Sequence, residues 1–155
     1  MNELLKWQRN VEFKTESGLD SVLDISFQVF GCELHTAPIV LVNHALTGNS
    51  DVAGEEQGWW KQLIGHGKTI DTDRYTVLAF NIPGNGYDGQ LIENYRDFNA
   101  ADIARLFAKA LDRLEIYELY AAIGGSLGGS LAWELAALRP QLIRYLIPVA
   151  CDWSS

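Results

Sequence analysis

Four short, mostly apolar runs constrain the fold of this chain most strongly. Continuous runs of this kind are typical of parallel strands, which are covered on both faces of their sheet. They occupy Pro38–Val42, Tyr75–Phe80, Leu119–Ile123 and Tyr145–Ala150. The stretches between them that predict helices are Trp59–Ile64, Asn99–Leu114 and Leu127–Leu138. This alternation predicts an α/β fold with a mostly parallel sheet flanked by helices.

The N-terminal part of the chain predicts a different arrangement. Apolar and polar residues alternate over Leu23–Phe30, which is the period of a half-buried strand, and Val11–Lys14 precedes it across a turn at Glu16–Gly18. We therefore expect an antiparallel strand pair ahead of the parallel sheet. The chain has 155 residues, of which 48% are hydrophobic, and we expect 1–155 to form a single α/β domain with one core.

Charge and cysteine content exclude several classes of protein. The chain carries 12 Lys and Arg against 20 Asp and Glu, a net charge of −8, with no basic cluster. Nucleic acids and anionic membranes are bound through basic patches, so we expect neither as a partner. No apolar run approaches the length of a membrane helix, and no secretory signal is visible. Two widely spaced cysteines, Cys32 and Cys151, suggest reduced thiols, and we expect a cytoplasmic protein.

The segment Gly124-Gly125-Ser126-Leu127-Gly128 carries the most chemical information. It has the form G-x-S-x-G, follows a predicted strand and opens a predicted helix, which is the setting of a nucleophile elbow. The glycines remove side chains that would collide in a sharp bend, and the helix N-terminus favours nearby negative charge. We predict Ser126 as the nucleophile, in a bend formed by Gly124, Gly125 and Gly128. A glycine-rich turn that packs a helix on a strand, or holds a phosphate, is the alternative.

A second segment, Asn43–Gly48, follows the predicted strand that ends at Val42. In enzymes with a nucleophile elbow, the loop after this strand donates one backbone N–H to the oxyanion hole, and the residue after the nucleophile donates the other. Backbone N–H groups suit this task because they are in place before the reaction. We assign the two positions to Leu46 and Leu127.

None of the three histidines is predicted as a catalytic base. His44 adjoins the oxyanion loop rather than the place of a base, so we expect it to be buried and to hold that loop through hydrogen bonds. His35 and His66 lie in polar segments and are expected in solvent. No spacing of histidines is typical of metal ligands, so we predict no metal site. The segment Asn81–Tyr87 is expected to be either a pocket wall or a plain surface loop.

Several motifs in order resemble the homoserine O-acetyltransferase family. They are His44–Gly48, Trp59-Trp60, Ile70–Tyr75 and Gly124–Gly129, with Glu16–Gly18 ahead of them, and the resemblance runs from about Phe13 to Ala150. It implies an α/β-hydrolase fold and a ping-pong reaction, in which a serine takes an acetyl group from acetyl-CoA and passes it to the hydroxyl of L-homoserine, a step toward methionine. It implies that Ser126 carries the acyl group and that the amides of Leu46 and Leu127 form the oxyanion hole. No bound cofactor is expected, and acetyl-CoA is expected as the acyl-donor substrate.

The chain departs from the family's pattern in two ways. Ala101–Arg105 stands where the family has a Thr-Ile-Arg-Asp run, which leaves the acyl donor and acceptor open. The catalytic triad on this fold runs in the order Ser, Asp or Glu, His, yet no histidine follows Ser126. We therefore expect the N-terminal portion of a longer acyltransferase, truncated before its lid and final strands and inactive alone.

Beyond small-molecule substrates, the expected partner is a protein. The last predicted strand would be an exposed apolar edge, so we expect self-association or pairing with a missing C-terminal segment. Two other functions stay open, namely a serine esterase of the same fold and a non-catalytic α/β module.

Overall fold

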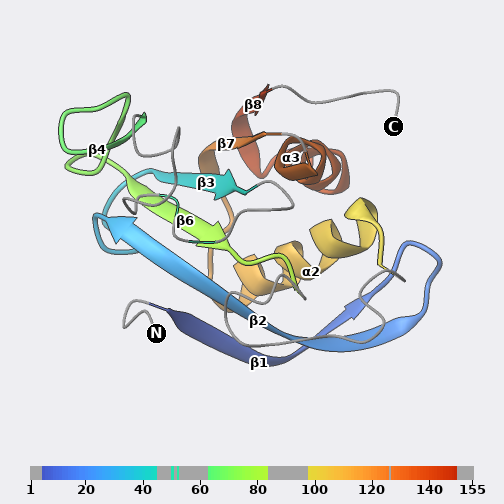
Figure 1. The fold of residues 1–155 in the computed structure, drawn as a ribbon. Helices are drawn as coiled ribbons and strands as arrows, with labels where there is room; N and C mark the ends of the chain where they lie inside the picture. Colours follow the sequence, from blue (N-terminus) through green and yellow to red (C-terminus); the bar gives the residue numbers. More distant parts are fainter. Residues whose placement is uncertain are drawn as a thin grey trace.

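The computed structural model describes residues 5–44, 50, 52, 63–83, 98–125 and 127–149, and it contains a six-stranded sheet with helices on one face (Figure 1). The strand order is β1-β2-β6-β3-β7-β8. The bounds are β1 (Lys6–Lys14), β2 (Asp20–Gly31), β3 (Ile39–Asn43), β6 (Thr76–Phe80), β7 (Leu119–Gly125) and β8 (Ile143–Val149), with helices α2 (Ala100–Arg113) and α3 (Leu127–Leu138).

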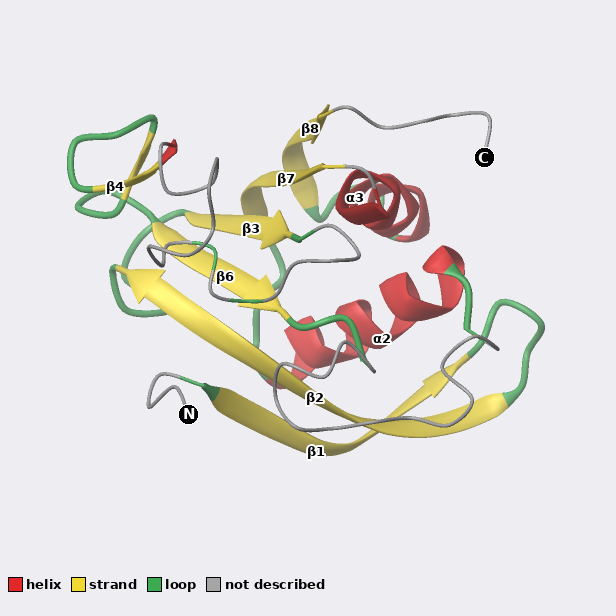
Figure 2. Cartoon of the chain, viewed as in Figure 1, coloured by secondary structure: helices red, strands yellow, loops and turns green. Residues whose placement is uncertain are grey.

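The sheet is parallel from β6 through β3 and β7 to β8, while β1 and β2 pair antiparallel and β2 joins β6 antiparallel. In Figure 2 the arrows of β3 and β6 point the same way and that of β2 points the opposite way. The predicted α/β fold with a mostly parallel sheet and an antiparallel N-terminal pair is therefore confirmed. Among the described residues, no helix is long and apolar enough to cross a bilayer.

The strand β1 begins earlier than the predicted Val11–Lys14. The sequence pattern missed its first half because a bulge interrupts the alternation of side chains. Gln8 pairs with Ile25 but Val11 pairs with Leu23, so one extra residue stands on β1. Asn10 takes a positive φ of 53° there. Arg113 at the end of α2 donates to the carbonyl oxygens of Arg9 and Asn10 at 2.6 and 2.7 Å, which fixes the bulge against the helix.

The two faces of the parallel sheet are buried in two separate clusters. Side chains of Leu41, Leu78 and Ala122 point toward α2 and α3 and belong to the larger cluster. On the other face, Val42, Val77 and Ile123 pack with the two-stranded unit of β4 (Ile64–Gly65) and β5 (Ile70–Asp71). Burial on both faces explains the continuous apolar runs of these strands.

The predicted helix over Trp59–Ile64 is wrong only at its last residue, since Leu63 is helical and Ile64 is not. Residues 59–62 lie outside the described part of the chain, and Ile64 begins β4 rather than ending a helix. Gly65 follows with a φ of 156°, outside the helical range, and Ile64 pairs with Ile70 and packs in the second cluster. Local helical spacing is overridden here by the backbone turn and by burial.

Helix α2 begins with a reciprocal cap that also holds the β1–β2 turn. The Asn99 side chain accepts from the backbone N–H of Asp102 at 2.8 Å, and the Asp102 carboxylate accepts from that of Asn99 at 3.1 Å. The same carboxylate accepts from the backbone N–H of Glu16 at 2.7 Å. Asp102, one of the residues in which the chain departs from the family's pattern, thus fixes α2 to the N-terminal hairpin.

Helix α2 is joined to the residue that follows α3 by a bidentate ion pair. The Arg139 guanidinium donates to both carboxylate oxygens of Asp112 at 2.6 and 2.8 Å. These hydrogen bonds lower the pKa of Asp112 below its usual value of 3.8, against the opposing effect of partial burial. A lowered folded-state pKa stabilises the protein above the unfolded-state pKa, and this contribution is lost as the pH falls through the folded-state value.

The substitution Asp112→Asn is expected to lower the free energy of unfolding by about 1 kcal/mol at neutral pH. The difference from the wild type should shrink as the pH falls below 3.8, because Asp112 itself becomes protonated. Urea denaturation at a series of pH values measures this. Asp20→Asn is the control, since its ion pair with Lys14 joins two largely exposed side chains and should contribute little. A destabilisation by Asp112→Asn that does not change with pH would contradict the assignment.

Candidate active site

The ends of three parallel strands meet at one edge of the sheet. Asn43 at the end of β3 stands opposite Gly124 of β7, and β6 runs parallel to β3 on its other side. The residues that follow these strands, His44, Asn81 and Leu127, therefore gather at this edge, where ligands bind in open α/β sheets.

The turn from β7 into α3 is closed by glycines. Strand β7 ends at Gly125 and α3 begins at Leu127, so Ser126 alone separates them. A Cβ atom on Gly124 would overlap the carbonyl group of Gly128 and lie 2.7 Å from the nitrogen of Gly129. The strand and the first helical turn thus touch through backbone atoms, and any side chain at Gly124 would force them apart.

Gly128 makes a second backbone contact, with the end of β3. A Cβ atom there would overlap the carbonyl oxygen of Asn43 and lie 2.6 Å from that of His44. The Asn43 side chain also donates to the Gly128 carbonyl at 3.4 Å. The turn after β7 and the segment after β3 are therefore held in direct contact, which is what a shared oxyanion hole requires.

Two of the three predicted reacting groups lie outside the described residues. These are Ser126 and Leu46, whose roles as nucleophile and oxyanion donor stay predictions. Leu127 is the first residue of α3. Its N–H is one of the helix N-terminal donors that have no partner within a helix, and it lies at the positive end of the helix dipole.

His44 is buried and bound through its ring. The backbone N–H of Ile82, just after β6, donates to His44 Nε2 at 3.0 Å, and the residue is about 1% exposed. Because Nε2 accepts, the ring is the neutral tautomer with its proton on Nδ1. The prediction that His44 is buried and hydrogen-bonded is confirmed, while the loop that it was expected to hold lies outside the described residues.

A buried polar cluster beside His44 was not predicted from the sequence. Asn81, after β6, accepts from the backbone N–H of Ser50 at 2.8 Å and donates to the hydroxyls of Ser50 and Ser26 at 2.8 and 2.9 Å. The Ser50 hydroxyl donates to Gln28 Oε1 at 2.6 Å. All four side chains are buried. Of the segment Asn81–Tyr87, the described start is thus interior structure, and residues 84–87 lie outside the described part.

The other histidines lie away from this edge. His35 Nε2 contacts the carbonyl oxygen of Leu114 at 2.9 Å and is exposed. His66 is exposed and pairs with Asp73 in the turn before β6. Asp71 at the end of β5 accepts from the backbone N–H groups of Asp73 and Gly67, which lowers the pKa of Asp71.

The side chains of His66, Asp71 and Asp73 lie close enough to reach one cation. However, their polar atoms already bind one another and the turn backbone, and Arg74 Nε lies 3.9 Å from Asp71. We assign no metal to them, and the expected absence of a metal site stays a prediction.

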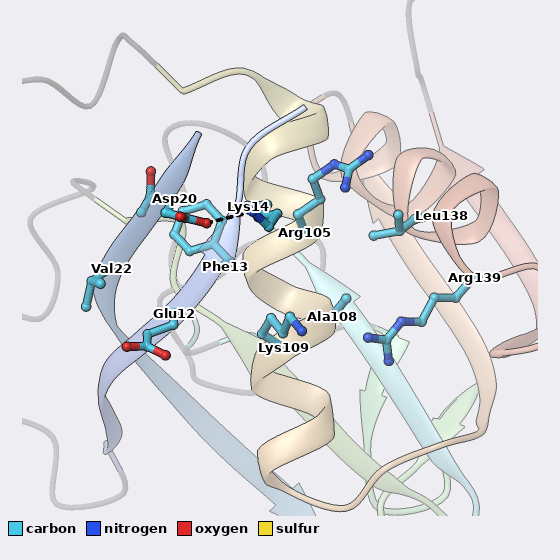
Figure 3. Close-up of a pocket in the computed structure, with 11 residues that line it drawn as sticks. Glu12, Phe13, Lys14, Asp20, Val22, Arg105, Ala108, Lys109, Leu138 and Arg139 are labelled. Atoms are coloured by element: carbon cyan, nitrogen blue, oxygen red, sulfur yellow. Dashed lines mark ion pairs between the residues drawn. The ribbon is translucent and has the colours of Figure 1, made fainter. Parts of the chain in front are cut away.

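A groove of about 660 Å³ crosses α2, between the β1–β2 hairpin and the end of α3 (Figure 3). Four of its lining side chains are basic, namely Lys14, Arg105, Lys109 and Arg139. Two of these cations are already paired with carboxylates, Lys14 with Asp20 and Arg139 with Asp112. None of its lining residues belongs to the turn after β7 or to the buried polar cluster. This groove therefore contributes nothing to the candidate active site.

Comparisons with known proteins agree with this geometry. The family model of the alpha/beta hydrolase fold matches residues 38–153. A homoserine O-acetyltransferase of Rhodospirillum rubrum is 33% identical over 90% of this chain and 41% of its own length. The crystal structure of homoserine O-acetyltransferase from Staphylococcus aureus superposes with a TM-score of 0.76 at 29% identity, covering 95% of this chain and 46% of that one.

A solved esterase is similar to the same extent. Esterase E22 superposes with a TM-score of 0.80 at 25% identity, over 95% of this chain and 47% of the esterase. This chain spans less than half the length of each of these three proteins. The resemblance to the homoserine O-acetyltransferase family is confirmed, and the matches include both acyltransferases and esterases.

The close contact at Gly128 predicts that a glycine-to-alanine substitution in a helix will here lower the free energy of unfolding instead of raising it. Replacing glycine by alanine inside a helix normally stabilises a protein by about 1 kcal/mol. Gly128→Ala is instead expected to lower the free energy of unfolding by about 2–4 kcal/mol, because the new methyl group would overlap the Asn43 carbonyl. Chemical denaturation of the purified variant measures the change.

Gly18→Ala is the matched control for this substitution. Gly18 has a φ of 93°, and no atom lies within 4 Å of the position that an alanine methyl group would take, so only backbone strain of about 1 kcal/mol is expected. A Gly128→Ala variant as stable as the wild type would show that β3 and α3 do not meet as described.

Proposed function

This chain belongs to the alpha/beta hydrolase fold family, and from that premise we propose that it carries out acyl transfer through a serine acyl-enzyme. Ser126 is the nucleophile, acetyl-CoA is the acyl donor, and the hydroxyl group of L-homoserine is the acceptor. The donor and acceptor are those that the names of the relatives suggest, and the geometry at the sheet edge supports the reaction class.

The observation that carries the proposal is the backbone contact of Gly128 with the end of β3. It brings the start of α3, where Leu127 follows the proposed nucleophile, against Asn43 and His44, the residues that precede the second proposed donor, Leu46, in the sequence. A tetrahedral intermediate needs N–H donors from both segments at the same oxygen. A turn that only packed a helix on its own strand would need glycine at Gly124, but not this further contact with β3.

The reaction proceeds in two steps. Ser126 Oγ attacks the thioester carbonyl carbon while a base takes its proton, the C–S bond breaks, and coenzyme A leaves as the protonated thiol. The homoserine hydroxyl then attacks the acetyl-serine, passes its proton to the same base, and Ser126 is released. In both tetrahedral intermediates the negative oxygen accepts from the amides of Leu127 and Leu46.

The proposed base is not one of the described histidines. His44 accepts a hydrogen bond from Ile82, and His35 and His66 lie away from the edge where the strands end. This chain spans less than half the length of the matched relatives, and we propose that the base and its carboxylate partner come from the remaining part of that length. Losing a base reduces the rate by several orders of magnitude.

A serine esterase is the second candidate, and the similarity to esterase E22 supports it. The two functions share the acyl-enzyme and differ only in the acceptor. Release of the acetyl group by homoserine faster than by water distinguishes the transferase from the esterase.

Acetylation of Ser126 tests the proposed function. When this chain is mixed with the C-terminal portion of a related homoserine O-acetyltransferase and acetyl-CoA, we expect one acetyl group on Ser126, found by mass spectrometry of the peptides. Ser126→Ala should abolish it, while Ser17→Ala in the β1–β2 turn should not. Absence of acetylation in the wild-type mixture, or its persistence at another serine in Ser126→Ala, would contradict the proposal.

We also propose that β8 is an association surface. It is the last strand of the sheet, and its Tyr145 and Ile147 side chains are 48% and 44% exposed. Both lie on the face opposite α2 and α3, since they pair with Ala121 and Ile123 of the second cluster. An apolar edge of this kind pairs with another strand, either in a second copy of the chain or in a C-terminal segment.

Ile147→Lys is expected to reduce this association. Sedimentation velocity over a range of concentrations should show the wild type as dimers or larger species and the variant shifted toward monomer. Leu19→Lys replaces another exposed apolar residue, in the β1–β2 turn, and should leave the distribution unchanged. A wild type that sediments as a monomer at every concentration, with no added segment, would contradict self-association.

The predicted cytoplasmic location is part of the same proposal. The Cys32 thiol is free and partly exposed, which suits a reducing compartment.

A further inference from the structure

Asn81 and Ile82, the two residues after β6, form hydrogen bonds with Ser50 and His44, which flank residues 45–49. The backbone N–H of Ile82 donates to His44 Nε2 at 3.0 Å, on one side of this segment. On the other side, the backbone N–H of Ser50 donates to Asn81 Oδ1 at 2.8 Å. The segment between them contains Leu46, the proposed oxyanion donor, and itself lies outside the described residues.

The Asn81 side chain is fixed in a single orientation by the groups around it. Its Nδ2 donates to Ser26 Oγ on β2 at 2.9 Å and to Ser50 Oγ at 2.8 Å, while its Oδ1 accepts from Ser50. Its own backbone N–H donates to the carbonyl oxygen of Ser26 at 2.9 Å. Only an amide offers a donor and an acceptor side by side in this arrangement, and the residue is about 1% exposed.

These contacts continue to the proposed nucleophile turn. His44, held by Ile82, presents its carbonyl oxygen to Gly128 in the first turn of α3, where a Cβ atom would lie only 2.6 Å away. The position of the residues after β6 is therefore coupled to His44 and Ser50, which flank 45–49, and through His44 to the first turn of α3.

We infer that Asn81 is a positioning residue for acyl transfer, which sets the place of the oxyanion loop relative to the turn after β7. It acts through its hydrogen bonds to Ser50 and through the neighbouring Ile82–His44 hydrogen bond. This inference rests on the proposed function for its chemical consequence. The hydrogen bonds that join Asn81 to Ser50 and Ile82 to His44, called the tether below, are a property of the described atoms.

Asn81→Ala would also lower stability if Asn81 had a purely structural role. The test therefore needs a second variant that loses a comparable buried amide elsewhere in the fold. Gln8 provides it, because its amide is also buried and donates to the carbonyl oxygen of Ala110 at 3.0 Å, on the far side of the sheet from Ser50. Asn81→Ala and Gln8→Ala should both lower the melting temperature. Only Asn81→Ala should affect the reactivity of Ser126.

The experiment has two readouts. The first is the second-order rate at which a fluorophosphonate probe labels Ser126 when this chain is mixed with the C-terminal portion of a related homoserine O-acetyltransferase, as in the acetylation test. This rate depends on the oxyanion hole because the phosphonyl oxygen occupies it. We expect Asn81→Ala to slow labelling by roughly 10–100-fold and Gln8→Ala by less than about 2-fold. The second readout is backbone hydrogen exchange, in which the Ser50 amide should exchange faster in Asn81→Ala and at the wild-type rate in Gln8→Ala.

The results separate the tether from the proposed function. Slower labelling together with faster Ser50 exchange supports the inference. Unchanged Ser50 exchange overturns it, and so does faster exchange with wild-type labelling. If the wild type in that mixture is not labelled at Ser126, the proposed function fails, and hydrogen exchange alone decides whether Asn81 holds Ser50.

Ser50→Ala is the second variant in case Asn81→Ala does not fold. It keeps the Ser50 N–H bond to Asn81 and removes only the hydroxyl that bridges Asn81 and Gln28. It should slow the labelling of Ser126 and speed the exchange of the amide at position 50, each by a smaller factor than Asn81→Ala does.

Discussion

The backbone contact between Gly128 and the end of β3 is the constraint on which the candidate active site depends. Parallel pairing places Asn43 opposite Gly124, and α3 begins at Leu127, two residues after the end of β7. Only a helix without side chains at this point comes close enough for its first turn to rest on the Asn43 carbonyl. The glycines therefore do more than allow a sharp bend, because they also bring together two segments from different βα connections.

Much of this arrangement follows from local sequence. The apolar runs predict the parallel strands because each is buried on both faces, and the G-x-S-x-G pattern predicts the turn because its glycines have a simple steric meaning. What local patterns missed has identifiable causes. The bulge at Asn10 breaks the alternation of β1, and Ile64 leaves the expected helix because Gly65 and its pairing with Ile70 impose a strand.

The buried polar cluster could not be predicted for a different reason. Ser26 and Gln28 occupy the polar positions of an alternating strand, and alternation assigns such positions to solvent. In the folded chain Ser50, which follows β3, covers this face of β2 and its hydroxyl meets Gln28. Asn81 follows β6, where an Asn-Ile-Pro-Gly sequence is typical of a surface loop. The burial of all these residues depends on the strand order, which no single segment of sequence reveals.

A cluster of this kind does not improve stability over a well-packed apolar core. Gln28 Nε2 is buried and has no hydrogen-bond partner among the described residues, which is a cost that an apolar side chain would avoid. What hydrogen bonds provide, and apolar contacts do not, is direction: the Asn81 amide admits one orientation of the Ser50 N–H, whereas a packed leucine would tolerate several. Directional tethering is most useful where a backbone amide has to meet a developing charge at a fixed distance. The polar interior is therefore best understood as the support of the sheet edge at which Leu127 begins α3, while α2 and the larger apolar cluster on the opposite face supply the stability.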